Sequence, residues 1–164
     1  MKRATTALAC AAMLCAPPAA AQWKYQLNES AFTAEGVNIA MTANAGYAFG
    51  FRCQGQDMEV LFLTNSNSFT NESLGASSLA PPQLLVRVDD HAVIEMNISL
   101  VENGGKSGAI GYVEMELANA VRNAKKRIAV ALRILGEIQH EEWFDVVDST
   151  IAIDKITAAC GITE

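Results

Sequence analysis

The chain has 164 residues, of which 51% are hydrophobic and 18% charged, and its formal net charge is −6 at pH 7. A chain of this length is sized for a single domain with one core. Its negative charge makes it a poor candidate for binding nucleic acid or anionic lipid surfaces.

The first 21 residues have the pattern of a secretory signal peptide. Lys2 and Arg3 precede an apolar run over residues 4–16, and three alanines end the segment. This order of basic, apolar and small residues is typical of a leader that is cleaved on export. We therefore predict a signal peptide at 1–21 and a single domain at 22–164, located in the bacterial periplasm or secreted.

Charge and hydropathy restrict the partners of that domain. The leader supplies +2 of the formal charge of −6, which leaves about −8 for the rest of the chain. Beyond the leader, no uninterrupted apolar run reaches the roughly 20 residues that span a bilayer. We predict no nucleic-acid partner and no membrane span.

Cys53 and Cys160 are the two cysteines outside the predicted leader. Exported proteins usually oxidise such a pair, whereas cytosolic proteins usually keep it reduced. We therefore predict a Cys53–Cys160 disulfide. Closing a loop of roughly 100 residues is worth about 4 to 5 kcal/mol in the chain-entropy model, a large share of a typical stability of about 5 to 15 kcal/mol.

Period-two patterns predict strands in the first half of the domain. Over 37–43 apolar residues occupy the odd positions, as in a half-buried strand. The strand predicted at 47–53 carries three aromatic residues and Cys53 on one side, which we assign to the core. Over 58–63 nearly every position is apolar, which favours a central strand covered on both faces.

Residues 64–82 are rich in Asn, Ser, Thr, Gly and Pro, which predicts a long surface loop. Loops of this length are often functional, and the alternative is an insertion without a role. If the protein is a binding module, we expect an exposed sheet edge or apolar patch near this loop.

Two further apolar runs, 84–88 and 92–98, predict a hairpin whose turn is Asp89-Asp90-His91. Aspartate suits such a turn because its side chain can bond the backbone nearby.

The remaining third changes from period two to period 3.6 and back, and the first helical part has acidic residues near its start and basic residues at its end, which match the helix dipole. The order predicts an α+β, mainly β fold, in which an antiparallel sheet or sandwich carries one inserted helix and a C-terminal helix tied by the disulfide. Asp148 or Ser149 is expected to cap that last helix. The predicted elements are a loop at 102–108, a strand at 109–113, a helix at 117–124, strands at 128–134 and 142–147, and a helix ending at Cys160.

Four short motifs in a fixed order carry a family resemblance. They are Trp23 in a short first strand, 51–53 (Phe-Arg-Cys), 86–90 (Val-Arg-Val-Asp-Asp) and 159–161 (Ala-Cys-Gly). In this order the chain resembles the small periplasmic VasI/TagO-like proteins associated with type VI secretion. It departs from their pattern at 30–35, where a more acidic segment is expected.

The resemblance implies an accessory or binding protein of the bacterial envelope, with an envelope or secretion-apparatus protein as partner. Cys53 and Cys160 match the paired cysteines of the family, and Arg87, Asp89 and Asp90 match its hairpin. Strand and turn chemistry alone also explains that hairpin, and we favour this structural role. The resemblance supplies no catalytic residues.

His91 and His140 each adjoin acidic residues and are the candidates for a metal or catalytic site. Imidazole with carboxylate suits zinc or manganese, but a site needs three or four converging ligands. We favour the alternative interpretation, in which 89–91 and 140–142 are solvated turns.

Other catalytic patterns are weak. The chain has no Gly-x-Ser-x-Gly elbow, phosphate loop or His-Glu-x-x-His helix. A glycosidase-like carboxylate pair has no support from the sequence, because acidic residues are plentiful. Aromatic residues alternating along strands are more often core than ligand groove. The carboxylate candidates are Asp89 or Asp90 with Glu95 or Glu142, and the aromatic candidates are Tyr47, Phe49, Phe51, Trp143 and Phe144.

We therefore predict a non-enzymatic periplasmic binding or accessory protein, linked to type VI secretion if the resemblance holds, with no cofactor and no catalytic or metal-binding residues. The alternative is a small exported hydrolase or metal-dependent enzyme. The enzyme requires His91 and His140 to lie within about 5 Å of shared carboxylates in a cleft.

Overall fold

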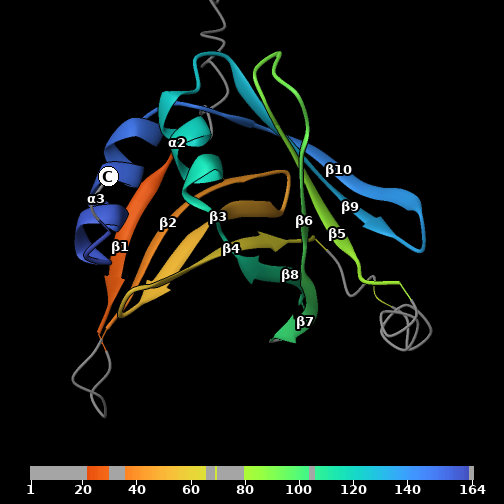
Figure 1. Cartoon of the computed structure of the whole chain (residues 1–164), viewed down its shortest axis with the longest axis horizontal. Coiled ribbons are helices and arrows are strands. Elements are labelled where there is room, and N and C mark those ends of the chain that lie inside the picture. The colour runs from red at the N-terminus through yellow and green to blue at the C-terminus, as the bar shows by residue number, and fades with distance from the viewer. Residues whose placement is uncertain (1–21, 30–35, 66–68, 70–79, 104–105, 163–164) are drawn as a thin grey trace, which may run out of the picture.

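The described part of the chain forms two antiparallel sheets and two helices, which confirms the predicted α+β, mainly β class (Figure 1). The predicted signal peptide lies outside the part of the chain that the structure describes. No helix in the described part is long and apolar enough to cross a membrane. The computed structural model describes residues 22–29, 36–65, 69, 80–103 and 106–162.

Sheet A has six strands in the spatial order β1-β2-β3-β4-β8-β7. A turn at Ala45 and Gly46 joins β2 to β3, and both residues have positive φ, at 48° and 86°. The strands are β1 (Lys24–Asn28), β2 (Val37–Asn44), β3 (Tyr47–Gln54), β4 (Asp57–Leu63), β7 (Ser99–Asn103) and β8 (Lys106–Tyr112).

Sheet B has four strands in the order β10-β9-β5-β6. The predicted hairpin around Asp89-Asp90-His91 is the β5–β6 pair. Only Ile98 separates β6 from β7, so one segment passes directly from sheet B to the edge of sheet A. The strands are β5 (Gln83–Val88), β6 (Ile94–Asn97), β9 (Arg127–Ile134) and β10 (Glu137–Asp145).

An aromatic core lies between the two sheets. Phe49 of sheet A packs on Phe144 of sheet B with ring centroids 5.9 Å apart, and Phe62 meets the same ring at 6.4 Å. Phe51 is fully buried and Cys53 is 1% exposed. The predicted core side of the aromatic strand is therefore confirmed.

Strand β2 confirms the predicted alternation, but its even positions face the core. Ala40 is 0% exposed and lies opposite Phe51, and Thr42 is 1% exposed and lies opposite Phe49. Small inward side chains leave room for the two rings, because core volume is shared between cross-strand neighbours. The larger apolar residues of β2 therefore point away from the core.

The prediction that β4 is covered on both faces is wrong. Its burial alternates, with one row in the core and the other row only half-buried. Sheet A thus has a second apolar face that no described element covers. The buried row is Met58, Val60 and Phe62, and the half-buried row is Glu59, Leu61 and Leu63.

Several predicted boundaries also change. The prediction of a loop at 102–108 is largely wrong, because the pairing of β7 with β8 extends to Asn103 and Lys106. The strand predicted at 142–147 begins earlier, at Glu137, and ends at Asp145. Residues 66–68 and 70–79 of the predicted 64–82 loop lie outside the described part of the chain. Within it, Thr64 is buried and donates its hydroxyl to the carbonyl of Ser107 at 3.0 Å.

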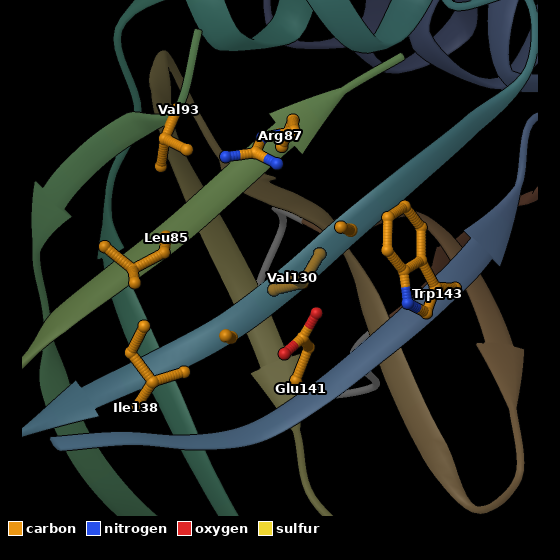
Figure 2. Close-up of a pocket in the computed structure, with 9 residues that line it drawn as sticks. Leu85, Arg87, Val93, Val130, Ile138, Glu141 and Trp143 are labelled. Atoms are coloured by element: carbon orange, nitrogen blue, oxygen red, sulfur yellow. The ribbon is translucent and has the colours of Figure 1, made fainter. Parts of the chain in front are cut away.

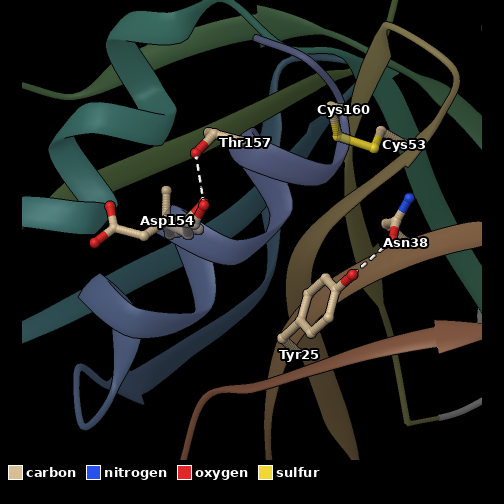
Figure 3. Close-up of a disulfide and its surroundings, with 7 residues drawn as sticks. Tyr25, Asn38, Cys53, Asp154, Thr157 and Cys160 are labelled. Atoms are coloured by element: carbon tan, nitrogen blue, oxygen red, sulfur yellow. Dashed lines mark hydrogen bonds between the residues drawn. A yellow bond between two sulfur atoms is a disulfide. The ribbon is translucent and has the colours of Figure 1, made fainter. Parts of the chain in front are cut away.

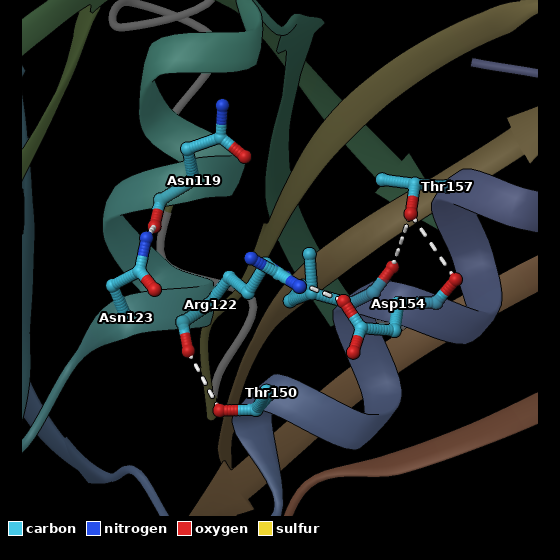
Figure 4. A network of polar contacts seen from close by, with 7 residues as sticks. Asn119, Arg122, Asn123, Thr150, Asp154 and Thr157 are labelled. Carbon is cyan, nitrogen blue, oxygen red and sulfur yellow. Dashed lines mark hydrogen bonds and ion pairs between the residues drawn. The ribbon is translucent and has the colours of Figure 1, made fainter. Parts of the chain in front are cut away.

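Both predicted helices are present, as α2 (Met115–Asn123) and α3 (Ser149–Ala159). They pack against each other, and α3 lies along β1 and β2 (Figure 1). Arg122 pairs with Asp154, and the Thr150 hydroxyl donates to the carbonyl of Arg122 at 2.8 Å (Figure 4). Asp148 occupies the N-cap position with φ of 63° and makes no side-chain cap hydrogen bond, contrary to the expected capping.

The predicted disulfide is confirmed. Cys53 of β3 is bonded to Cys160 at the end of α3, across 107 residues and with a Cα–Cα distance of 6.1 Å (Figure 3). Both cysteines are buried, with exposures of 1% and 2%. The bond fixes α3 to the aromatic strand, and Tyr25 of β1 adds a 2.7 Å hydrogen bond to Asn38 of β2 beside it.

Replacing Cys53 and Cys160 together with alanine is expected to lower the free energy of unfolding by about 4 kcal/mol, because the unfolded chain is no longer closed into a loop. Urea unfolding of the oxidised protein and of the double variant measures this difference. A reductant should destabilise the natural chain by a similar amount and leave the variant unchanged. Equal stability of the two oxidised proteins would contradict the structural role of the bond.

Candidate functional site

The outer face of sheet B carries a hollow of about 130 Å³ (Figure 2). Alanines of the inner strand β9 form its floor, and larger residues of the strands on either side form its walls. The hollow forms because small residues lie between large ones on this face of the sheet. The lining residues are Leu85, Arg87, Val93, Ala129, Val130, Ala131, Ile138, Glu141 and Trp143.

A β-bulge in β10 aims the residues of that wall. Between Gln139 and Glu142 strand β10 advances three residues while β9 advances two. His140 lies inside the bulge with a left-handed φ of 53°. The extra residue reverses the inward–outward alternation of the strand. Ile138 and Trp143, which are five positions apart, therefore line the same hollow.

Trp143 forms one wall and is 37% exposed. The guanidinium carbon of Arg127 lies 3.9 Å from the centroid of its ring. This cation–π contact restrains the indole, so the wall is preformed. The expectation that the aromatic residues belong to the core is thus confirmed for Phe49, Phe51 and Phe144. Tyr47 is half-buried against that core, and Trp143 is the exception.

Arg87 and Glu141 are the two ionic residues that line the hollow. Among the residues that the structure describes, neither side chain has a hydrogen bond or ion pair. By contrast, Arg133 on the same sheet donates to Glu95 at 2.8 Å and to Gln83 at 2.9 Å. An unpaired cation and an unpaired anion beside an apolar floor are available to a bound molecule.

The hollow continues past Trp143 and Arg87 to the turn that follows β5. A second depression, of about 390 Å³, shares these two residues and reaches Asp89, Asp90 and His91. Sequence-predicted candidates therefore border the same surface as the β10 wall. We call the two joined depressions the sheet B groove.

Asp89 has a structural role at the end of this groove. Its carboxylate accepts hydrogen bonds from the backbone N–H groups of Lys125, Lys126 and Arg127, at 2.9, 2.7 and 3.1 Å. Burial alone would raise the pKa of Asp89, but the three N–H groups stabilise the charged form and hold the pKa below its ordinary value. The carboxylate thus joins the β5 turn to the start of β9.

The two histidines do not converge on shared carboxylates. His91 is exposed in the β5 turn, whereas the ring of His140 lies 3.4 Å from the Tyr47 hydroxyl and edge-on to Phe69. Burial lowers the pKa of His140, which favours the neutral imidazole. No group of three His, Cys, Asp or Glu residues in the described ranges is arranged to hold a metal ion.

The interpretation of the two acidic tripeptides as turns holds for one of them. Residues 89–91 form the expected turn, but 140–142 lie inside β10. His140 has the left-handed backbone conformation that is common in turns, but here a bulge within the strand imposes it.

The carboxylates considered for paired acid–base chemistry are engaged in contacts with the protein. Asp90 pairs with Lys126, and Glu142 accepts a hydrogen bond from the Asn44 side-chain amide at 3.2 Å. Asp89 and Glu95 have the partners given above. Each of these four carboxylates therefore has a partner within the protein.

Sequence reasoning missed Arg127, Glu141 and Trp143 as parts of one surface. A signal for the groove was present in β9, where the odd positions place two alanines between two arginines and the even positions are all apolar. Ala129 and Ala131 between two arginines mark a shallow floor on the outer face. The bulge in β10 had no such signal.

Comparisons of the chain with family models, with curated proteins and with solved structures give no match. The fold and the groove are therefore the basis for a functional proposal.

Asp89→Asn is expected to lower the free energy of unfolding at neutral pH by about 1 kcal/mol, because a charged acceptor of three N–H groups becomes neutral. Since the folded pKa is depressed, this difference should be complete above the unfolded pKa of about 3.9 and should disappear as the pH falls through the lower folded value. Chemical unfolding from pH 2 to 7 measures it.

Asp90→Asn is the matched control, because Asp90 is an exposed neighbour whose pair with Lys126 is worth little. A loss for Asp90→Asn equal to that for Asp89→Asn would contradict the anchoring role of Asp89.

Proposed function

We propose that the protein is an exported, non-enzymatic binding or accessory protein of the bacterial envelope, and that it binds a polypeptide partner through the sheet B groove. The observation that carries this proposal is the unpaired Arg87 and Glu141 beside an alanine floor and a restrained Trp143.

The hollow, of about 130 Å³, has the size of one side chain, and the depression of about 390 Å³ joined to it extends the groove, as the binding of a chain segment requires. Small-molecule sites usually have about 300 to 1,000 Å³, whereas a cavity of about 150 Å³ holds a benzene-sized group. The hollow of about 130 Å³ therefore fits one leucine- or phenylalanine-sized side chain. An acidic and a basic residue flanking that side chain would pair with Arg87 and Glu141.

The buried disulfide supports a location outside the cytosol, since disulfides persist in oxidising compartments. Together with the leader-like first 21 residues, it favours the periplasm or secretion. The resemblance to VasI/TagO-like proteins extends the proposal to a partner in the type VI secretion apparatus.

Site-specific photocross-linking tests the proposal. A photoreactive phenylalanine derivative at Ile138, which is 58% exposed in the groove, should form an adduct with an envelope protein in the native bacterium. The same probe at Gln56, exposed in the β3–β4 turn, is the control and should not form it. Absence of the adduct at Ile138, or equal adducts at both positions, would contradict a binding role for the groove.

Arg87→Glu in the Ile138 probe background is expected to reduce the yield of that adduct at least about tenfold, because it places two like charges beside the bound segment. Lys106→Glu, the same charge change at an exposed position of β8, should leave the yield unchanged. The two adduct yields, compared by mass spectrometry at equal protein levels, give the result.

A further inference from the structure

The outer face of sheet A carries a second surface, which differs from the groove. Two rows of residues cross five strands of the sheet in register, and both are built of apolar and small residues with one serine. The first row is Met41, Gly50, Leu61, Ile110 and Ser99, and the second is Ala43, Ala48, Leu63, Gly108 and Val101. We call them the sheet A outer face, together with Ile39 and Tyr112 of the next row.

No element in the described part of the chain covers this face. The disulfide to Cys53 places α3 on the opposite, core side of the sheet, and α2 packs on α3. Leu61 and Ile110 are only half-buried, and Tyr112 is 77% exposed, the most exposed of the large hydrophobic residues described. A contiguous apolar patch across several strands is a mark of an interaction surface.

On β2, β3, β4, β7 and β8 the two rows carry no ionisable side chain, and the next row contains Arg52 and Glu59, which form an ion pair at 2.6 Å. Lys24 of β1 and Lys106 of β8 border the two rows at their edges. The chain as a whole is acidic, with a formal charge of −6. The two rows themselves therefore add no charge repulsion to a contact between two copies.

We propose that the sheet A outer face is the contact surface of a symmetric dimer of this chain. A twofold interface uses the same patch on both subunits, so the patch must complement itself. An apolar face with internally paired charges meets that condition. This inference goes beyond the proposed function, because it uses the face of the molecule that does not contain the groove.

The area of the face matches what a specific dimer needs. Five strands spaced about 4.8 Å apart and about seven residues long at about 3.3 Å per residue give roughly 24 by 23 Å, or about 550 Å² in projection. Specific interfaces bury about 800 Å² of accessible surface per partner, and accessible surface exceeds projected area. Homodimer interfaces are also the more apolar class.

Sedimentation equilibrium of the oxidised mature protein, from nanomolar to about 100 µM, tests the proposal over the affinity range of ordinary dimers. Leu61→Glu should raise the dimer dissociation constant at least about tenfold, because the substitution enters the interface twice and places carboxylates in an apolar contact. Ile151→Glu is the control, the same chemical change at a 55% exposed position of α3, and should leave the constant unchanged.

Tyr112→Glu is the second variant, because Tyr112 is too exposed for its replacement to unfold the monomer. It should also weaken the dimer. The proposal is overturned if the natural chain stays monomeric over the whole concentration range, also if the monomer is found to bind neutral lipid vesicles. A dimer that neither Leu61→Glu nor Tyr112→Glu weakens overturns it as well. Photocross-linking at Ile138 is independent of these results, so the dimer and the groove can fail separately.

Discussion

The burial of one row of side chains from the middle of sheet A determines most of the structure. Phe49 and Phe51 of β3 and Phe62 of β4 occupy the space between the sheets, where they are fully buried. Because side chains alternate along a strand, this burial also decides which residues point outward on every neighbouring strand. Cys53 continues the inward row, and its bond to Cys160 holds α3 on the core side.

The same constraint gives the molecule two outer faces of different chemistry. On sheet B the inward apolar row of β9 leaves arginines and alanines outside, which yields a charged groove with a small apolar floor. On sheet A the inward aromatic row leaves Met41, Leu61 and Ile110 outside, which yields a mainly apolar surface. The groove suits a segment of a partner with specific side chains, and the apolar surface suits a second copy. One protein of this size can therefore use separate faces for assembly and for recognition.

The sequence predicts those features that depend on local pattern. The aromatic alternation at 47–53 predicted a strand and its core side, and the pairing of Cys53 with Cys160 followed from their being the two cysteines outside the leader. The inward side of β2 could not be predicted, because it depends on the rings of β3 opposite Ala40 and Thr42. The groove could not be predicted either, since the bulge at His140 reverses the alternation of β10 through its pairing with β9. Both failures concern cross-strand contacts, which a single strand does not encode.

A comparison of two neighbouring residues of β4 tests the assignment of inner and outer faces most directly. Val60 is 0% exposed in the core, whereas Leu61 points to the outer face. In dilute solution, Val60→Ala should lower the free energy of unfolding by about 2 kcal/mol and Leu61→Ala by only about 1 kcal/mol, although the second substitution removes more atoms. A larger loss for Leu61→Ala than for Val60→Ala would show that the faces of sheet A are reversed and would contradict the account.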